Sequence, residues 1–115
     1  MNSSIPPMSV YLANVPFEDT GRLKYRPALV IIPRIHSSSY TGVLKITTKY
    51  ATKSNAVKKT YYPLKNWYDE GLSAQSYVDI HKVYSIPTAQ IRAKKPIGKL
   101  TVDDIQGLYD FVSNS

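Results

Sequence analysis

Short runs of apolar, aromatic and β-branched residues recur along the chain and are separated by polar segments. Runs of this kind, bounded by Gly, Pro, Asp and Ser, are typical of β-strands. The sequence contains no internal repeat and no heptad pattern, which argues against a solenoid or a coiled coil. The pattern predicts five strands, over Val10–Val15, Pro27–Ile32, Thr41–Tyr50, Thr60–Leu64 and Ser76–Tyr84.

The second of these runs is the most apolar part of the chain. Residues Ala28–Ile32 contain no polar side chain, which predicts a short strand buried on both faces. Pro27 has a fixed φ and no backbone N–H, so we expect it to be the first residue of the strand rather than its centre. Arg26 would then lie at the mouth of the strand, where its guanidinium has a defined direction.

The connecting segments are mostly polar. Met1–Met8 is rich in Ser and Pro and is expected to be a flexible arm, followed by one domain over residues 9–115. The lysine-rich segment Ala51–Lys59 is predicted to be a flexible loop or hairpin tip. Asn66–Gly71 is expected to form one short helical turn. Ser85–Arg92 fits either a short strand or a turn of helix.

The last element is predicted to be a helix. Thr101 suits the N-cap, and Asp103 and Asp104 fall in the first turn, where carboxylates interact favourably with the exposed N–H groups and the helix dipole. Asp104 also has the spacing of a capping box, with Asp in place of Glu. Apolar residues then follow at helical spacing, at Ile105, Leu108, Tyr109, Phe111 and Val112. The expected fold is mainly β with this C-terminal helix packed across a small, strongly bent sheet or barrel.

The charge distribution suggests the kind of partner. The chain has 115 residues, a net charge of +7 and no cysteine. Between Gly21 and Lys65 there are ten Lys or Arg residues and no acid, which favours a basic surface and a polyanionic partner. Ten tyrosines and one tryptophan favour nucleic acid, because aromatic rings can stack on bases, although tyrosine is also an ordinary strand residue.

Compartment, cofactors and metals follow from what the composition lacks. No apolar run approaches the roughly 18 residues of a membrane span, and the N-terminus lacks a signal-peptide pattern. We therefore expect a cytoplasmic protein. His36 and His81 are far apart and have no clustered ligands near them in sequence, so no metal site and no cofactor is expected. Asp103 and Asp104 are explained by the helix start rather than by acid–base chemistry.

Arg26 and the pair Thr47 and Thr48 are the candidates for chemistry. A guanidinium offers a rigid fork of donors to a phosphate and stays charged, and a threonine hydroxyl can bind a phosphate oxygen. Together they could bind a phosphodiester and stabilise the charge that develops as it is cleaved. A surface arginine and ordinary strand threonines remain the alternative interpretation.

Several motifs in order resemble those of a known family. The stretches are Val10–Phe17, Arg26–Ile31, Ile46–Lys49, Gly71–Leu72 with Ser76–Val78, and Ile97–Asp104. In this order they resemble the PemK/MazF-type toxins over roughly Ser9 to Val112. The resemblance implies a small SH3-like barrel that forms a homodimer. It also implies a toxin of a type II toxin–antitoxin system that cleaves single-stranded mRNA without a metal, inhibited by a small antitoxin with an acidic tail.

Residue roles can be carried over from the resemblance only where the motifs match. Arg26 matches the family's arginine before proline, and Thr47 matches its threonine, with Thr48 as the alternative. These are the expected catalytic residues. The lysines of the acid-free segment are the expected RNA contacts, at Lys24, Lys45, Lys49 and Lys53.

The sequence also departs from the family pattern. Met8 and Ser9 replace a Gly-Asp pair, and Ala74 and Ser76 occupy the positions where some members carry an acid–base arginine and aspartate. Asp79 and His81 lie nearby and could substitute for that pair. A catalytically silent module that binds nucleic acid or peptide therefore stays open, as does a toxin that poisons DNA gyrase, a property of a related family.

Overall fold

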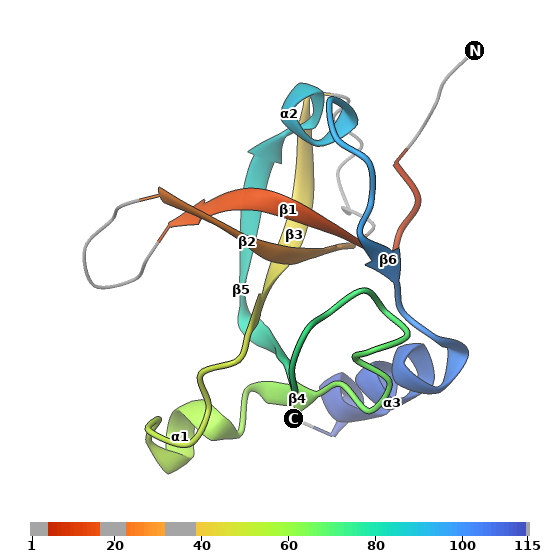
Figure 1. Cartoon of the computed structure of the whole chain (residues 1–115). Helices are drawn as coiled ribbons and strands as arrows, with labels where there is room; N and C mark the ends of the chain where they lie inside the picture. The colour runs from red at the N-terminus through yellow and green to blue at the C-terminus, as the bar shows by residue number, and fades with distance from the viewer. Residues whose placement is uncertain (1–4, 17–22, 32–38, 115) are drawn as a thin grey trace.

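The protein is built on one six-stranded antiparallel sheet that curls into a half-barrel (Figure 1). The computed structural model describes residues 5–16, 23–31 and 39–114, and for residues 16, 23 and 24 it describes the backbone alone. The strand order is β4-β5-β3-β2-β1-β6. The strands are β1 Ser9–Pro16, β2 Leu23–Val30, β3 Tyr40–Thr47, β4 Tyr61–Pro63, β5 Tyr77–Pro87 and β6 Gly98–Lys99. The helices are α1 Asn55–Lys58, α2 Thr88–Arg92 and α3 Val102–Ser113. The predicted fold class, mainly β with a C-terminal helix, is confirmed.

The curl of the sheet gives the molecule two apolar clusters, because alternate residues of each strand point to opposite faces. On one face, Leu29 and Ile46 pack with Leu108 of α3. On the other face, Ala28 and Val43 pack with Ile91 of α2. The segment Ala28–Val30 is buried on both faces, as its apolar run predicted.

The expectation that Pro27 begins the strand is wrong. β2 begins at Leu23, and Pro27 lies inside it. The N–H of Ile31 donates to Gly42 of β3 over 3.0 Å, so every second residue before Ile31 directs its backbone toward the β3 side. Pairing of β2 with β3 stops at Ala28. The nitrogen of Pro27 therefore points to the side on which β3 no longer pairs with β2. The N–H that proline lacks costs the sheet no hydrogen bond there.

An irregularity in β5 reshapes the centre of the sheet. Leu44 of β3 pairs with Val83, whereas the next residue, Lys45, pairs with Asp79. Residues 80–82 are therefore inserted as a bulge, which bends the strand and redirects its side chains. The prediction of a strand over Ser76–Tyr84 is correct in type but ends too early. α2 follows β5 at once, so both alternatives for Ser85–Arg92 are realised in succession.

Three further local predictions need correction. β3 ends at Thr47, short of the predicted Tyr50. The segment expected to be a flexible loop contains α1, whose first turn is capped because the Ser54 hydroxyl accepts from the N–H of Val57. The short strand β6 was not predicted, because two residues carry no readable period. Part of the predicted N-terminal arm and residue Ile32 lie outside the described residues.

The C-terminal helix is anchored through a buried carboxylate. Thr101 caps α3 as predicted, accepting from the N–H of Asp104 over 3.3 Å. The carboxylate of Asp104 does not turn back to close a capping box. Instead it accepts from the hydroxyl of Tyr62 (2.8 Å) and from the backbone N–H groups of Lys65 (3.0 Å) and Asn66 (2.9 Å). The helix start is thereby fastened to the end of β4 and the loop that follows it.

A second buried carboxyl completes this network. Glu70 Oε2 accepts from the backbone N–H of Thr101 over 2.9 Å. In a capping box, this N–H would instead donate to the side chain three residues after the N-cap. Burial, followed by the hydrogen bond and charge of Asp104, raises the pKa of Glu70 to about 7. Burial opposes ionisation of Asp104 as well, but its bonds from the N–H groups of Lys65 and Asn66 hold its pKa below the usual value. Asp104 therefore stays ionised, whereas Glu70 changes its charge near neutral pH.

Candidate functional site

Arg26 and Thr47 lie just beyond the point where their neighbouring strands stop pairing. The last pair of β2 and β3 joins Ala28 to Lys45, and each candidate residue lies two positions beyond that pair. Both residues line one pocket of about 170 Å³, together with Pro27, Ile46, Thr48, Lys49 and Ser76.

The two threonines in this pocket differ in their surroundings. Thr47 is only 8 % exposed, and its hydroxyl oxygen accepts from the N–H of Lys49 over 3.1 Å. Thr48, the first residue after the end of β3, is exposed. Because a hydroxyl can accept and donate at once, Thr47 still has a proton to offer. Thr47 is thus the better placed of the two beside the half-buried Arg26.

Lys45, Asp79 and His81 form a charged cluster. The Asp79 carboxylate, 1 % exposed, lies 3.7 Å from the Lys45 ammonium and 2.5 Å from His81 Nδ1. The same carboxylate oxygen, Oδ1, also accepts from the backbone N–H of His81 over 3.1 Å. His81 lies in the bulge of β5, two residues after Asp79, with its ring beside the Asp79 carboxylate. The imidazole itself remains partly exposed.

The other sequence candidates are placed differently. Lys45, expected to contact RNA, is 7 % exposed and directed at Asp79, whereas Lys49 and Lys53 are exposed. The side chain of Lys24 and the whole of His36 lie outside the described residues.

Ala74 and Ser76, the positions where some family members carry an acid–base pair, contact each other. Ser76 is 2 % exposed, and its hydroxyl donates to the carbonyl of Ala74 over 2.9 Å. Neither side chain ionises near neutral pH, so the acid–base chemistry expected at these positions cannot come from them.

An aromatic stack beside the pocket was not identified from the sequence. Tyr77 pairs with Thr47 across β5 and β3, and its ring stacks on Tyr50 with centroids 4.3 Å apart. The ammonium of Lys58 in α1 lies 5.0 Å from the Tyr50 ring. The tyrosine-rich composition hinted at such a feature, but the partners are too far apart in sequence to be paired by pattern.

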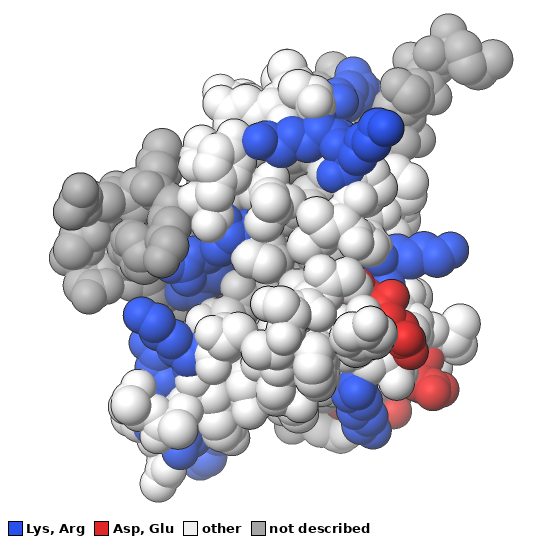
Figure 2. Space-filling model, viewed as in Figure 1, with Lys and Arg blue, Asp and Glu red and all other residues white. Residues whose placement is uncertain are grey.

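Charge is segregated across the molecule. Among the described residues, every acid except Asp79 comes from residues 69–70 and 103–110. In Figure 2 the acidic side chains gather in one region near α3, while Lys and Arg side chains lie over the rest of the visible face. Those same described ranges contain no group of three or more His, Cys, Asp or Glu side chains arranged to hold a metal ion. None of their helices is long and apolar enough to cross a membrane.

The fold and the site together define the class of protein. It is a small, mainly β protein with a six-stranded sheet curled into a half-barrel, a C-terminal helix and a positively charged pocket. The family model of the PemK-like, MazF-like toxin of type II toxin–antitoxin systems matches residues 7–112. The chain therefore belongs to this family and is a PemK-like toxin, which implies an antitoxin as its partner. A search of curated proteins gives no match.

Proposed function

We propose that this toxin is a metal-independent endoribonuclease that cleaves single-stranded RNA at the Arg26–Thr47 pocket. In this reaction the ribose 2′-hydroxyl attacks the adjacent phosphorus, and the bond from phosphorus to the 5′-oxygen breaks. The products carry a cyclic phosphate and a 5′-hydroxyl. Since the nucleophile belongs to the substrate, the protein has to bind the phosphate, stabilise its developing charge and transfer protons. One observation carries the proposal: both residues line a single pocket.

Arg26 and Thr47 are the proposed phosphate ligands. The guanidinium supplies two parallel donors to the non-bridging oxygens and stays ionised throughout. The Thr47 oxygen is engaged by the N–H of Lys49, so its hydroxyl proton is directed elsewhere and can donate to the phosphate. Exposed Lys49 and Lys53 would attract neighbouring phosphates along the strand.

His81 is the proposed general base, with Asp79 as its positioning residue. Asp79 engages Nδ1, which fixes the tautomer and leaves proton exchange to Nε2. Lys45 neutralises the second carboxylate oxygen from 3.7 Å. Asp79 pairs with Lys45 of β3, which lies two residues before Thr47, about 7 Å along the strand. His81 would take the proton of the 2′-hydroxyl as the attack begins, and the leaving 5′-oxygen would receive a proton from solvent.

The expected homodimer is also part of this proposal. Val83 and Tyr40 are each 54 % exposed, and Val83 lies beside Ile31 over the Cβ-free surface of Gly42. An apolar patch of this kind favours a protein interface. Light scattering should give a mass near twice that of the chain, and Val83→Asp should reduce it. A monomer at all concentrations would remove the dimer from the proposal.

The test of the activity is cleavage of a long single-stranded RNA in EDTA. Wild-type protein should give fragments whose new 5′ ends accept phosphate from a kinase without prior phosphatase treatment. Arg26→Ala should lower the rate by about 10²- to 10³-fold, and His81→Gln by about 10²- to 10⁴-fold. Arg92→Ala, which removes an exposed arginine of α2, is the matched control and should cleave normally.

Other outcomes discriminate the competing functions. A folded wild type that binds RNA with a steep salt dependence but leaves it intact would be a silent binding module. Inhibition of DNA supercoiling without RNA cleavage would indicate a gyrase poison. Equal rates for Arg26→Ala and Arg92→Ala would refute the assigned site even if RNA is cleaved.

A further inference from the structure

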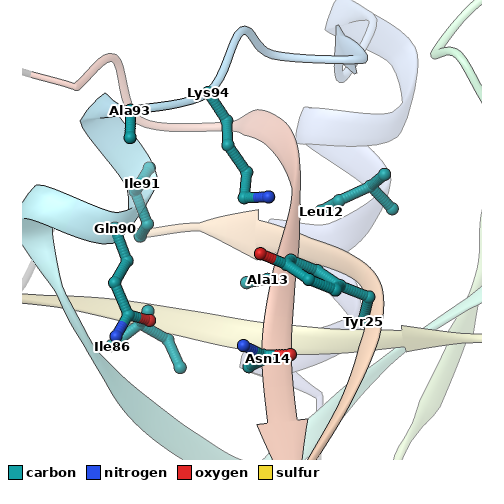
Figure 3. Close-up of a pocket in the computed structure, with 9 residues that line it drawn as sticks. All are labelled: Leu12, Ala13, Asn14, Tyr25, Ile86, Gln90, Ile91, Ala93 and Lys94. Atoms are coloured by element: carbon teal, nitrogen blue, oxygen red, sulfur yellow. The ribbon is translucent and has the colours of Figure 1, made fainter.

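A groove separates the outer edge of β1 from α2, on the side of the sheet away from β2 (Figure 3). Its volume is about 410 Å³, within the range of sites that bind small molecules or short peptide segments. The groove is lined by Leu12, Ala13, Asn14, Tyr25, Ile86, Gln90, Ile91, Ala93 and Lys94. None of these residues belongs to the Arg26–Thr47 pocket. The proposed activity therefore leaves this groove without a role.

The floor of the groove is an open strand edge. β6 pairs with β1 only at Ser9 and Val10, and the carbonyl of Val10 accepts from the N–H of Ile97 over 2.8 Å. Every second residue after Val10 directs its backbone to that same edge. The N–H and C=O groups of Leu12 and Asn14 therefore point away from β2 and toward the groove. Within the described part of the chain, no backbone hydrogen bond covers this edge beyond Val10.

The side chains around this edge are of mixed character, with exposed aliphatic, aromatic, amide and cationic groups. Leu12 is 40 % and Tyr25 52 % exposed, although both belong to the central strands. The ammonium of Lys94 lies 3.9 Å from the centroid of the Tyr25 ring, and Figure 3 shows it reaching over the groove. Among the described residues that line the groove, Lys94 is the charged one, and none of them is an acid.

We propose that this groove binds an extended, acidic segment of the antitoxin, which adds a strand to the open edge of β1. The free N–H and C=O groups at Leu12 and Asn14 would pair with the backbone of the segment. Alternate apolar side chains of the segment would pack on Leu12 and Ile91. An acidic side chain would meet Lys94. This inference rests on the toxin having a protein partner and does not depend on ribonuclease activity.

The backbone chemistry of the edge favours peptide over RNA. An edge strand offers donors and acceptors at a fixed repeat of two residues, which an extended peptide matches along its length. The ribose–phosphate backbone of RNA has no amide N–H that could donate to the C=O groups of the strand edge. The exposed side chain of Leu12 likewise suits an aliphatic side chain better than a phosphate. RNA at this edge is accordingly one of the outcomes that would overturn the proposal.

The test uses a synthetic nine-residue peptide in which Glu and Val alternate, together with the same peptide N-methylated at every second amide. Titration into ¹⁵N-labelled toxin should shift the amide signals of Leu12 and Asn14 and slow their hydrogen exchange. The N-methylated peptide has the same charge but cannot complete the ladder, so its affinity should be at least about tenfold lower.

Charge-reversal variants check the contribution of Lys94. Lys94→Glu should weaken binding of the unmodified peptide by about fivefold, since an exposed attractive pair becomes repulsive. Lys65→Glu makes the same change in net charge at an exposed position outside the groove and should bind nearly as wild type. Both side chains are exposed, so both variants should fold.

Three results would overturn the proposal. The first is equal binding of the two peptides, which would mean that charge alone attracts them. The second is unchanged amide signals at Leu12 and Asn14 at millimolar peptide. The third is protection of these two amides by a short single-stranded RNA. If wild-type toxin fails to cleave RNA, the peptide titration still tests this inference, because it measures peptide binding and does not depend on RNA cleavage.

Discussion

Replacing Glu70 by Gln should make the protein more stable at high pH and leave it unchanged at low pH. Glu70 has no exposed surface, and its Oε2 accepts from the N–H and the hydroxyl of Thr101 at 2.9 and 3.3 Å. Its pKa is raised from 4.5 to about 7, first by burial and then by the Asp104 side chain. A glutamine keeps the oxygen that Thr101 requires and supplies an N–H where the protonated acid has its O–H.

The magnitude follows from the linkage between protonation and folding. The folded state binds the proton more tightly than the unfolded state, so the stabilising contribution is complete below pH 4.5 and is lost as pH rises through about 7. One pKa unit corresponds to 1.36 kcal/mol, and the change from 4.5 to about 7 therefore corresponds to about 3 kcal/mol. Glu70→Gln should abolish this slope and gain up to about 3 kcal/mol at pH 8.

The assay is urea unfolding of both proteins at intervals between pH 4 and pH 8. The free energy of unfolding of the wild type should fall relative to that of Glu70→Gln as the pH rises from about 4.5 to about 7. Asp69→Asn changes the neighbouring, exposed carboxylate and should retain the wild-type slope. The reasoning fails if Glu70→Gln keeps the same slope as the wild type, or if it is destabilised equally at every pH.

Three further substitutions test the packing that holds the site's scaffold together, each by thermal unfolding. Gly71→Ala should destabilise by more than about 3 kcal/mol, because φ is +88° and a Cβ would overlap the carbonyl oxygen before β6; a stable variant would contradict this geometry. Gly107→Ala should cost about 1–3 kcal/mol, since its Cβ would overlap the Tyr62 hydroxyl; Tyr62→Phe beside it should recover part of the loss. Thr101→Ala should cost about 0.5–2 kcal/mol, and Thr101→Ser should restore most of it.

The elements themselves were largely predictable because their signals are local. The cap at Thr101 and the apolar spacing of Ile105 and Leu108 define α3 within one stretch of chain. The apolar run at Ala28–Val30 likewise indicated a strand buried on both faces. The errors fall where local signals are short or overridden. Pro27 is tolerated inside β2 because β3 no longer pairs with the strand at that point. No residue near Pro27 in the sequence indicates this.

The candidate site shows the same division. Arg26 and Thr47 could be proposed from side-chain chemistry and motif order, but only the folded chain shows that they line one pocket. The contact between Asp79 and His81 forms at the bulge in β5, where residues 80–82 pair with no residue of β3. The role of Lys45 changed from a surface cation to the partner of Asp79 for the same reason.

The sequence by itself determined the strands, the final helix, the basic character and the residues able to bind a phosphate. These properties depend on side-chain chemistry and on neighbours within a few positions. Only the tertiary structure decided which of those residues line one pocket, that a carboxylate holds the imidazole, and that no described residue pairs with the outer edge of β1 beyond Val10. Strand register, bulges and sheet edges result from pairings between distant segments, and such pairings have no signature within any one segment.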